Sequence, residues 1–187
     1  MHTLWLAALV GAASALAVAA PAPASKPSAD AVAAVVSFRD PLQWKRSDYA
    51  NSMGADPVVS FAKGSERISV YVYGAPGSAY KTPEDFLKGP AATSMGRPAE
   101  RIGDTRVNGR NAALYRRSYP LGDYDPDKPE TGPARLGEQL FCVLPPAADG
   151  RFAVLAHDQN RPRPGTGSGG DAWKAFLKTV KPAGPKP

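Results

Sequence analysis

The stretch that decides the fold is EQLFCVLPPAADGRFAVLAH, residues 138–157. A turn segment of Pro, Ala, Asp and Gly separates two apolar runs, residues 138–144 and 151–157. Short apolar runs of this length, bounded by turn residues, indicate two β-strands joined in a hairpin. Apolar residues fall at odd and even positions alike, which is typical of strands that are buried on both faces. The sequence therefore predicts a strand pair inside a sheet that is covered on both sides.

The register of this pair bears on the only cysteine, Cys142. If Leu144 pairs with Phe152, then Cys142 and His157 point to opposite faces. They are also offset by three residues, about 10 Å along the ladder, which argues against a nucleophile–base dyad. We expect Cys142 to be a small buried hydrophobe with an unreactive thiol. We expect His157 and Asp158 to form a surface pair or a turn at the strand end.

A helix near the C-terminus is expected to cover this sheet. An apolar stripe at helical spacing consists of Trp173, Phe176, Leu177 and Val180. Asp171 precedes the stripe and is expected to cap the helix. Three basic residues fall away from the stripe: Lys174, Lys178 and Lys181. The stripe predicts core packing rather than a ligand site.

The first half of the chain predicts two strands and a short helix. Residues 58–62 and 67–73 read as strands, and in the second of them Ile68, Val70 and Val72 share one face. Trp44 and Leu42 are expected to be early core anchors. Helix-start residues follow at 82–85 (TPED), where Thr82 can accept bonds from free N–H groups and a proline fits the first helical position.

Asn108-Gly109 is the strongest hairpin signal, because both positions of a type I′ turn need positive φ. With a two-residue turn, Arg101 would face Arg116. Like charges opposite one another destabilise a strand pair unless something anionic lies nearby.

Two stretches of this pattern, TPEDFL at 82–87 and DAWKAFL at 171–177, resemble the PsbP-like superfamily. The resemblance lies in element order over residues 38–182 and includes no diagnostic motif. It implies an α+β fold: an antiparallel β-sheet covered by helices on both faces, with the C-terminal helix packed on the sheet. It also implies a non-enzymatic accessory or binding protein.

The N-terminal segment predicts export. Residues 1–24 contain no Lys, Arg, Asp or Glu, and the apolar run 4–20 is Ala-rich and short for a spanning helix. It is typical of a signal peptide cleaved after Ala19 or Ala24. A periplasmic or extracellular protein would follow, soluble and with no later transmembrane segment. Residues 25–37 are expected to be a flexible lead-in, 38–182 a single domain, and 183–187 a disordered tail.

The net charge of +6 leaves two interpretations. It can be an ordinary solvated surface, or it can contact an unknown anionic protein or envelope component. Nucleic acid is not expected as a partner, because no binding motif is recognised. The candidate contact residues lie around the predicted hairpin: Arg101, Arg106, Arg110, Arg116 and Arg117.

Catalytic chemistry has few side chains to draw on, because one His and one Cys remain after residue 24. No catalytic residue, cofactor or metal site is therefore predicted. Two alternatives stay open. A weak calcium module would use the acidic stretch 123–127, although the EF-hand pattern fails there. A carboxylate-based envelope hydrolase needs two carboxylates about 5–10 Å apart, and its candidates are Asp104, Asp123, Asp125, Asp127 and Glu138.

Overall fold

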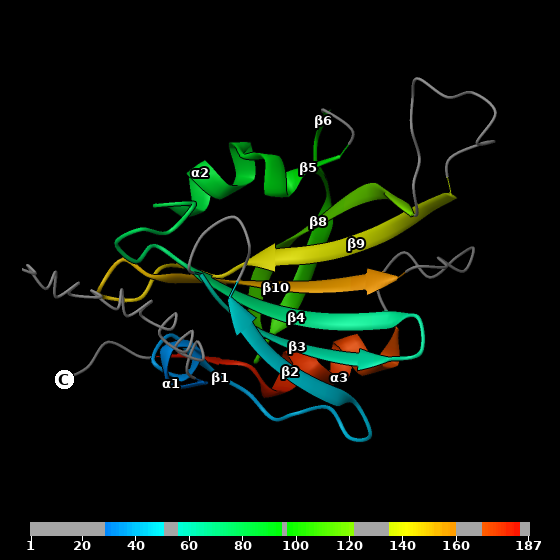
Figure 1. Ribbon diagram of the computed structural model, residues 1–187, viewed down its shortest axis with the longest axis horizontal. Helices are drawn as coiled ribbons and strands as arrows, with labels where there is room; N and C mark the ends of the chain where they lie inside the picture. The colour runs from blue at the N-terminus through cyan, green and yellow to red at the C-terminus, as the bar shows by residue number, and fades with distance from the viewer. Residues whose placement is uncertain (1–28, 51–55, 95–96, 122–134, 160–169, 184–187) are drawn as a thin grey trace, which may run out of the picture.

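The computed structural model describes residues 29–50, 56–94, 97–121, 135–159 and 170–183, and its centre is a seven-stranded antiparallel sheet (Figure 1). The strand order is β2-β3-β4-β10-β9-β8-β7. The strands are β2 (Lys45–Ala50), β3 (Pro57–Lys63), β4 (Glu66–Tyr73), β7 (Glu100–Val107), β8 (Arg110–Leu121), β9 (Arg135–Val143) and β10 (Phe152–Gln159).

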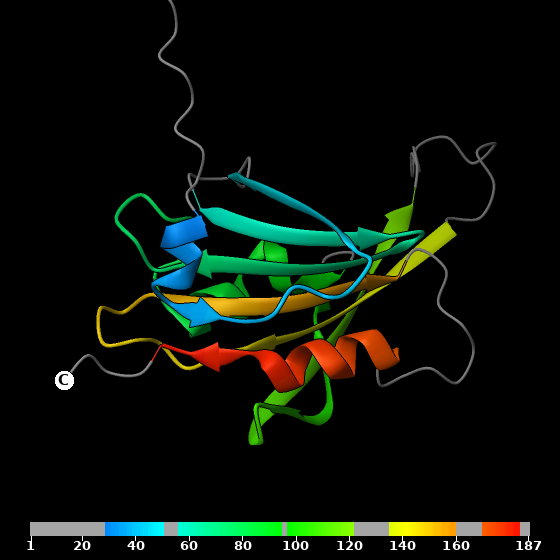
Figure 2. The ribbon, with the colours of Figure 1, turned by 90° about the horizontal axis from the view of Figure 1, so that it is seen from below.

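Shorter elements lie around this sheet. They are α1 (Ala29–Ala33), β1 (Val36–Ser37), α2 (Pro83–Lys88), the 3₁₀ turn η1 (Pro90–Ala92), β5 (Thr93–Ser94), β6 (Arg97–Pro98), α3 (Asp171–Thr179) and β11 (Lys181–Pro182). Figure 2 shows α3, β11 and β1 running along one face of the sheet. Helix α2 lies on the other face (Figure 1).

The central strands carry two separate cores, one on each face. On the α3 side, Cys142 and Leu155 pack with Trp173 in a large aliphatic cluster. On the α2 side, Phe141 and Phe152 pack in a mainly aromatic cluster. Strand β10 pairs with β4 on one edge and β9 on the other, and nearly all of its residues are buried. The prediction that the 138–157 pair is buried on both faces is confirmed.

The prediction of an α+β sheet covered by helices on both faces is wrong. About half of the structure is strand, and the helices are three short segments. Helix α3, with nine residues, covers part of one face. The six-residue α2 and the aromatic side chains around it cover part of the other. Large aromatic rings such as Tyr73 and Phe86 fill space that a longer helix would otherwise have to cover.

The predicted register of the central hairpin is also wrong, by one residue. Leu155 lies opposite Cys142, and His157 lies opposite Leu140. Cys142 and His157 therefore share the α3 face and are two residues apart along the ladder. The segment that joins β9 to β10 keeps the same register, because the N–H of Leu144 donates to the carbonyl oxygen of Ala153 rather than pairing with Phe152.

In the β7–β8 hairpin, Arg101 does not lie opposite Arg116, so the expected like-charge pair is absent. The turn is as predicted, with Val107 opposite Arg110. A register shift between Arg101 and Gly103, where Gly103 has φ +144°, then places Arg101 opposite Tyr115. Bulges of this kind insert one extra residue into a strand and change what each later residue faces.

The N-terminal part of the domain is more ordered than expected. Residues 29–37 of the predicted flexible lead-in form α1 and β1, with Val32, Val35 and Val36 buried in the α3-side core. Trp44 packs against that core, but Leu42 is 89% exposed and is not a core anchor. The signal peptide and most of the predicted tail lie outside the described residues.

Helix α2 begins at the predicted cap, and helix α3 begins one residue earlier than predicted. The hydroxyl of Thr82 accepts the N–H of Asp85 at 3.1 Å, and the Asp85 carboxylate accepts the N–H of Thr82 at 3.1 Å. The predicted N-cap is confirmed and forms a capping box. In α3 the N-cap is Gly170 rather than Asp171, which is the first helical residue. The stripe of α3 is buried as predicted.

Candidate functional site: a cationic surface at the hairpin tip

The tip of the β7–β8 hairpin is held against the C-terminal end of α3. Asn108 and Gly109 adopt φ +47° and +80°, the left-handed values that a type I′ turn requires. The N–H of Asn108 donates to the carbonyl oxygen of Leu177 at 3.0 Å. The same carbonyl oxygen also accepts the N–H of Val180 at the helix C-cap, at 3.4 Å. The turn is therefore fixed beside the basic face of α3.

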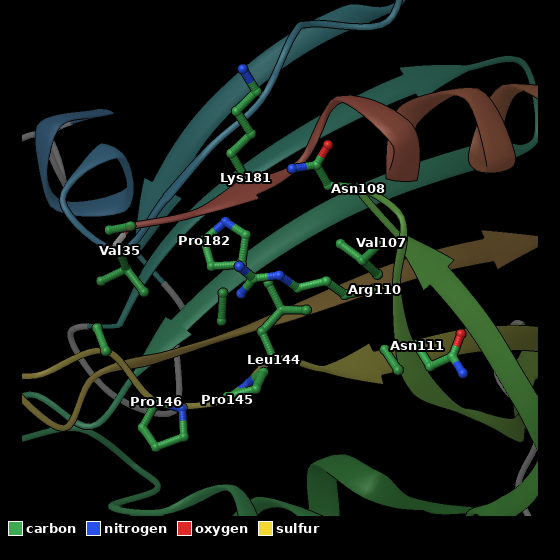
Figure 3. Close-up of a pocket in the computed structure, with 14 residues that line it drawn as sticks. Val35, Val107, Asn108, Arg110, Asn111, Leu144, Pro145, Pro146, Lys181 and Pro182 are labelled. Atoms are coloured by element: carbon green, nitrogen blue, oxygen red, sulfur yellow. The ribbon is translucent and has the colours of Figure 1, made fainter. Parts of the chain in front are cut away.

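A pocket of about 380 Å³ opens on one side of this tip (Figure 3). Its walls come from distant parts of the chain, and they include Leu144, Pro145 and Pro146 after β9 and Pro182 in β11. In Figure 3 the side chain of Arg110 extends from the start of β8 across the pocket, between Pro182 and Leu144. A guanidinium group is thus presented against rigid apolar walls.

A second pocket, of about 520 Å³, lies on the other side of the tip. Arg106 of β7 and two lysines of α3, Lys174 and Lys178, line it. Asn111 lines both pockets, so the two are adjacent. We call the five cations around them the hairpin-tip cluster: Arg106, Arg110, Lys174, Lys178 and Lys181.

No member of the hairpin-tip cluster forms an ion pair with another described residue, and all five are exposed. Arg106, Lys174 and Lys178 line one pocket and Arg110 lines the adjacent one, so these exposed cations repel one another and produce a positive local potential. The amino group of Lys181 points away from Arg110 (Figure 3). An anionic group at this place would relieve that repulsion.

The structure separates the five arginines that the sequence proposed together. Arg106 and Arg110 belong to the hairpin-tip cluster. Arg101 pairs with Asp104 at 2.6 Å, and Arg116 pairs with Glu100 at 2.7 Å. Arg117 is partly buried and donates to the side-chain carbonyl of Gln139 and to the carbonyl oxygen of Ala91. Only two of the five are therefore placed to meet a partner without first breaking a bond.

Sequence reasoning missed the three lysines of the cluster as site residues. Two of them could have been recognised from their spacing, because Lys174 and Lys178 lie one turn apart on the polar side of α3. Joining them to Arg106 requires the contact between Asn108 and Leu177, across nearly 70 residues of sequence. The prolines that line the first pocket indicated only loops in the sequence, and nothing in the sequence predicted that they form a pocket wall.

The carboxylates proposed for a hydrolase are not brought together in the described part of the chain. Asp104 lies opposite Ala113 on β8, and Glu138 lies opposite Ser118 on the other edge of the same strand. Five residues along β8 and two strand spacings separate them by about 19 Å. The remaining candidates, Asp123, Asp125 and Asp127, lie outside the described residues, as does the acidic stretch of the calcium alternative. Among the described residues, no three His, Cys, Asp or Glu side chains are grouped to hold a metal ion.

Cys142 and His157 share a face but are not organised for catalysis. Both are completely buried, and the ring of His157 stacks on Trp173 with centroids 5.6 Å apart. The expected surface position of His157 is therefore wrong. Burial raises the pKa of the Cys142 thiol to about 12, because the apolar core does not solvate the charged thiolate.

Cys142 provides a direct test of this burial. In native protein at pH 8, iodoacetamide should leave Cys142 unmodified, since the thiolate that reacts is disfavoured and enclosed. Addition of urea past the unfolding midpoint should allow complete alkylation, measured by intact mass. Rapid alkylation of the native protein would show that the α3-side core is open.

No described helix is both long and apolar enough to cross a bilayer. No protein-family model and no curated protein matches the chain.

Proposed function

We propose that this protein is an exported, non-catalytic binding protein that contacts an anionic partner through the hairpin-tip cluster. Export is proposed from the uncharged, Ala-rich segment at residues 1–24. An accessory role agrees with the resemblance of residues 38–182 to PsbP-like proteins. It also agrees with the burial of Cys142 and His157, the residues best suited to nucleophilic catalysis.

The observation that carries the proposal is the arrangement of unpaired cations beside apolar walls. Arg110 lies across an apolar pocket, and Arg106 lies beside two lysines in the adjacent pocket. An arginine can bind a carboxylate or phosphate through two parallel hydrogen bonds. The walls formed by Leu144 and Pro146 add contact area for an apolar group next to that anion. The partner should therefore combine an acidic group with an apolar one.

The double variant Arg106→Glu/Arg110→Glu should weaken binding to an anionic probe by at least about tenfold, or about 1.4 kcal/mol. The probe is a vesicle of phosphatidylglycerol and phosphatidylcholine, and co-sedimentation measures binding. An acidic polysaccharide tested in parallel distinguishes a lipid surface from a glycan.

The matched control is Lys63→Glu/Lys88→Glu, which changes the net charge equally at exposed positions away from the hairpin tip. It should alter binding by less than about threefold. Equal losses in the two double variants would mean that the total charge, rather than the hairpin-tip cluster, governs binding. The proposal would then be wrong.

A further inference from the structure

A third pocket, of about 320 Å³, lies at the opposite end of the sheet, beside the turn that joins β3 and β4. In Figure 1 this turn lies near the start of β9 and the end of β10. The first hairpin-tip pocket lies at the other end of β9, where Leu144 and Pro145 line it. Most of the lining is polar: Ser65, Glu66, Arg67, Tyr71, Arg117, Tyr119, Gln139 and Asp158. Of these residues, the sequence suggested a binding role for Arg117 alone, and it placed Asp158 in a surface pair or turn with His157.

A row of polar side chains crosses four neighbouring strands at this pocket. In the register, Arg117 of β8 lies opposite Gln139 of β9, which lies opposite Asp158 of β10, which lies opposite Arg67 of β4. Arg117 Nε donates to Gln139 Oε1 at 2.7 Å, and Gln139 Nε2 donates to Asp158 Oδ1 at 2.6 Å. Three of the four groups are thereby joined in one chain.

These hydrogen bonds determine which donors and acceptors remain available to a ligand. Because a guanidinium only donates, it holds the amide oxygen of Gln139 toward Arg117 and the amide nitrogen toward Asp158. Asp158 Oδ2 and the exposed guanidinium of Arg67 make no hydrogen bond or ion pair with another described residue. The pocket therefore presents an acceptor and a set of donors side by side, already oriented.

The charged groups on this face include both signs. Arg67, Arg117 and Asp158 belong to the polar row, whereas the carboxylate of Glu66 lies 3.5 Å from His157 of the α3 face. At the hairpin tip the only acidic residue among the described pocket linings is Asp104, which is paired with Arg101. Asp158 would repel an anion, so a neutral ligand with both donors and acceptors fits this row better.

Two phenol rings complete the pocket. The ring of Tyr119 lies over Gly137, where an added Cβ would come within 2.6 Å of it. Burial raises the pKa of both Tyr71 and Tyr119 to about 12, so both phenols keep their protons at neutral pH. Each ring has an apolar face and a hydroxyl group, which suits a ligand with C–H groups on one side and hydroxyls at its edge.

The half-buried carboxyl of Asp158 costs stability, which favours a functional reason for it. Burial raises the pKa of Asp158, and the bond from Gln139 and the nearby arginines only partly offset this. The rest of this face is an aromatic core, where an apolar side chain would avoid that cost. Ionisable groups kept in unfavourable surroundings within a pocket are concentrated at functional sites.

We propose that this pocket binds one unit of a neutral saccharide, with two adjacent hydroxyls held between Asp158 and Arg67. A hydroxyl that donates to Asp158 Oδ2 and a neighbour that accepts from Arg67 use both groups that lack partners. The pocket volume lies at the lower end of the range for small-ligand sites, about 300–1,000 Å³. The site goes beyond the proposed contact at the hairpin tip and does not depend on it.

The test is a titration of ¹⁵N-labelled protein with glucose and N-acetylglucosamine at millimolar concentrations, followed by amide and side-chain NMR shifts. Saturable shifts are expected for the Gln139 side-chain amide and the Arg67 and Arg117 Nε–H groups. Arg67→Met and Asp158→Asn should each weaken binding at least about tenfold. Lys63→Met, at an exposed residue near the same turn, should bind as the wild type does.

Parallel titrations with inorganic phosphate and with glycine distinguish the ligand class. If phosphate or glycine binds at these signals and neither sugar does, the saccharide assignment is wrong. Absence of saturable shifts with either sugar also overturns it. The variant Arg106→Glu/Arg110→Glu should bind sugar normally, so that a failure of this site and a failure of the hairpin-tip surface are separate results.

Discussion

Replacing Trp173 with alanine should lower the free energy of unfolding by about 3–5 kcal/mol. Trp173 is completely buried and stacks between His157 and Phe176. Its loss would leave a cavity between α3 and the sheet that these rings cannot fill. Urea unfolding followed by circular dichroism measures the change, with the slope checked against the wild type.

The matched control is Leu42→Ala, because Leu42 is an apolar side chain that is 89% exposed. It should change the unfolding free energy by less than about 0.5 kcal/mol. Trp173→Phe keeps an aromatic ring in the stack and should cost clearly less than the alanine, which gives a measurable variant if Trp173→Ala does not fold. An alanine variant as stable as the wild type would show that α3 does not seal the sheet.

The protein should lose stability as the pH falls below about 6.5, and His157 should account for a separable part of this loss. Burial lowers the pKa of His157, and the attraction of Glu66, 3.5 Å away, only partly offsets it. The unfolded chain therefore binds this proton at a higher pH than the folded chain. The stabilising contribution of neutral His157 is complete at pH values above its pKa in the unfolded chain. Below that pH it falls by about 1.4 kcal/mol per pH unit, until the pKa of His157 in the folded protein is reached.

The variant His157→Phe isolates this effect. It keeps a ring against Trp173 and removes two buried nitrogens that have no hydrogen-bond partner. It should be at least as stable as the wild type at pH 7, and the difference in its favour should grow as the pH falls to 5. Asp158, whose raised pKa acts in the opposite direction, is unchanged in both proteins. Parallel stability curves would show that His157 is not buried in its neutral form.

The elements that sequence reasoning placed well have local physical signals. The Thr82 cap and the Asn108-Gly109 turn depend on residues within a few positions of one another. The apolar stripe of α3 depends only on helical periodicity. Burial of residues 138–157 on both faces followed from an apolar pattern without alternation.

The predictions that were wrong concern strand register and helical cover, which depend on long-range contacts or on a single residue. The connection after Leu144 sets the β9–β10 register, and a shift of one residue moved Cys142 and His157 onto the same face. The bulge at Gly103 prevented the expected clash of arginines. The helical cover was overestimated, because the aromatic packing around Phe86 is tertiary and leaves no periodic signal.

The candidate site was predicted in part. The basic hairpin was recognised, but opposite-charge neighbours such as Glu100 and Asp104 neutralise some of its arginines in three dimensions. The lysines of α3 join Arg106 only because the hairpin tip docks on the helix end. The saccharide pocket has no local signature, because each member of its polar row comes from a different strand.

The most direct test of the proposed function is site-specific photocrosslinking in intact cells that express the full chain. A benzoylphenylalanine at Asn111, which lines both hairpin-tip pockets, should give a discrete adduct. The adduct should disappear when Arg106→Glu/Arg110→Glu is added, and the same probe at Lys88 on α2 should not give it. An Asn111 adduct that survives the charge reversal, or that forms equally from Lys88, would contradict a partner bound at the hairpin tip.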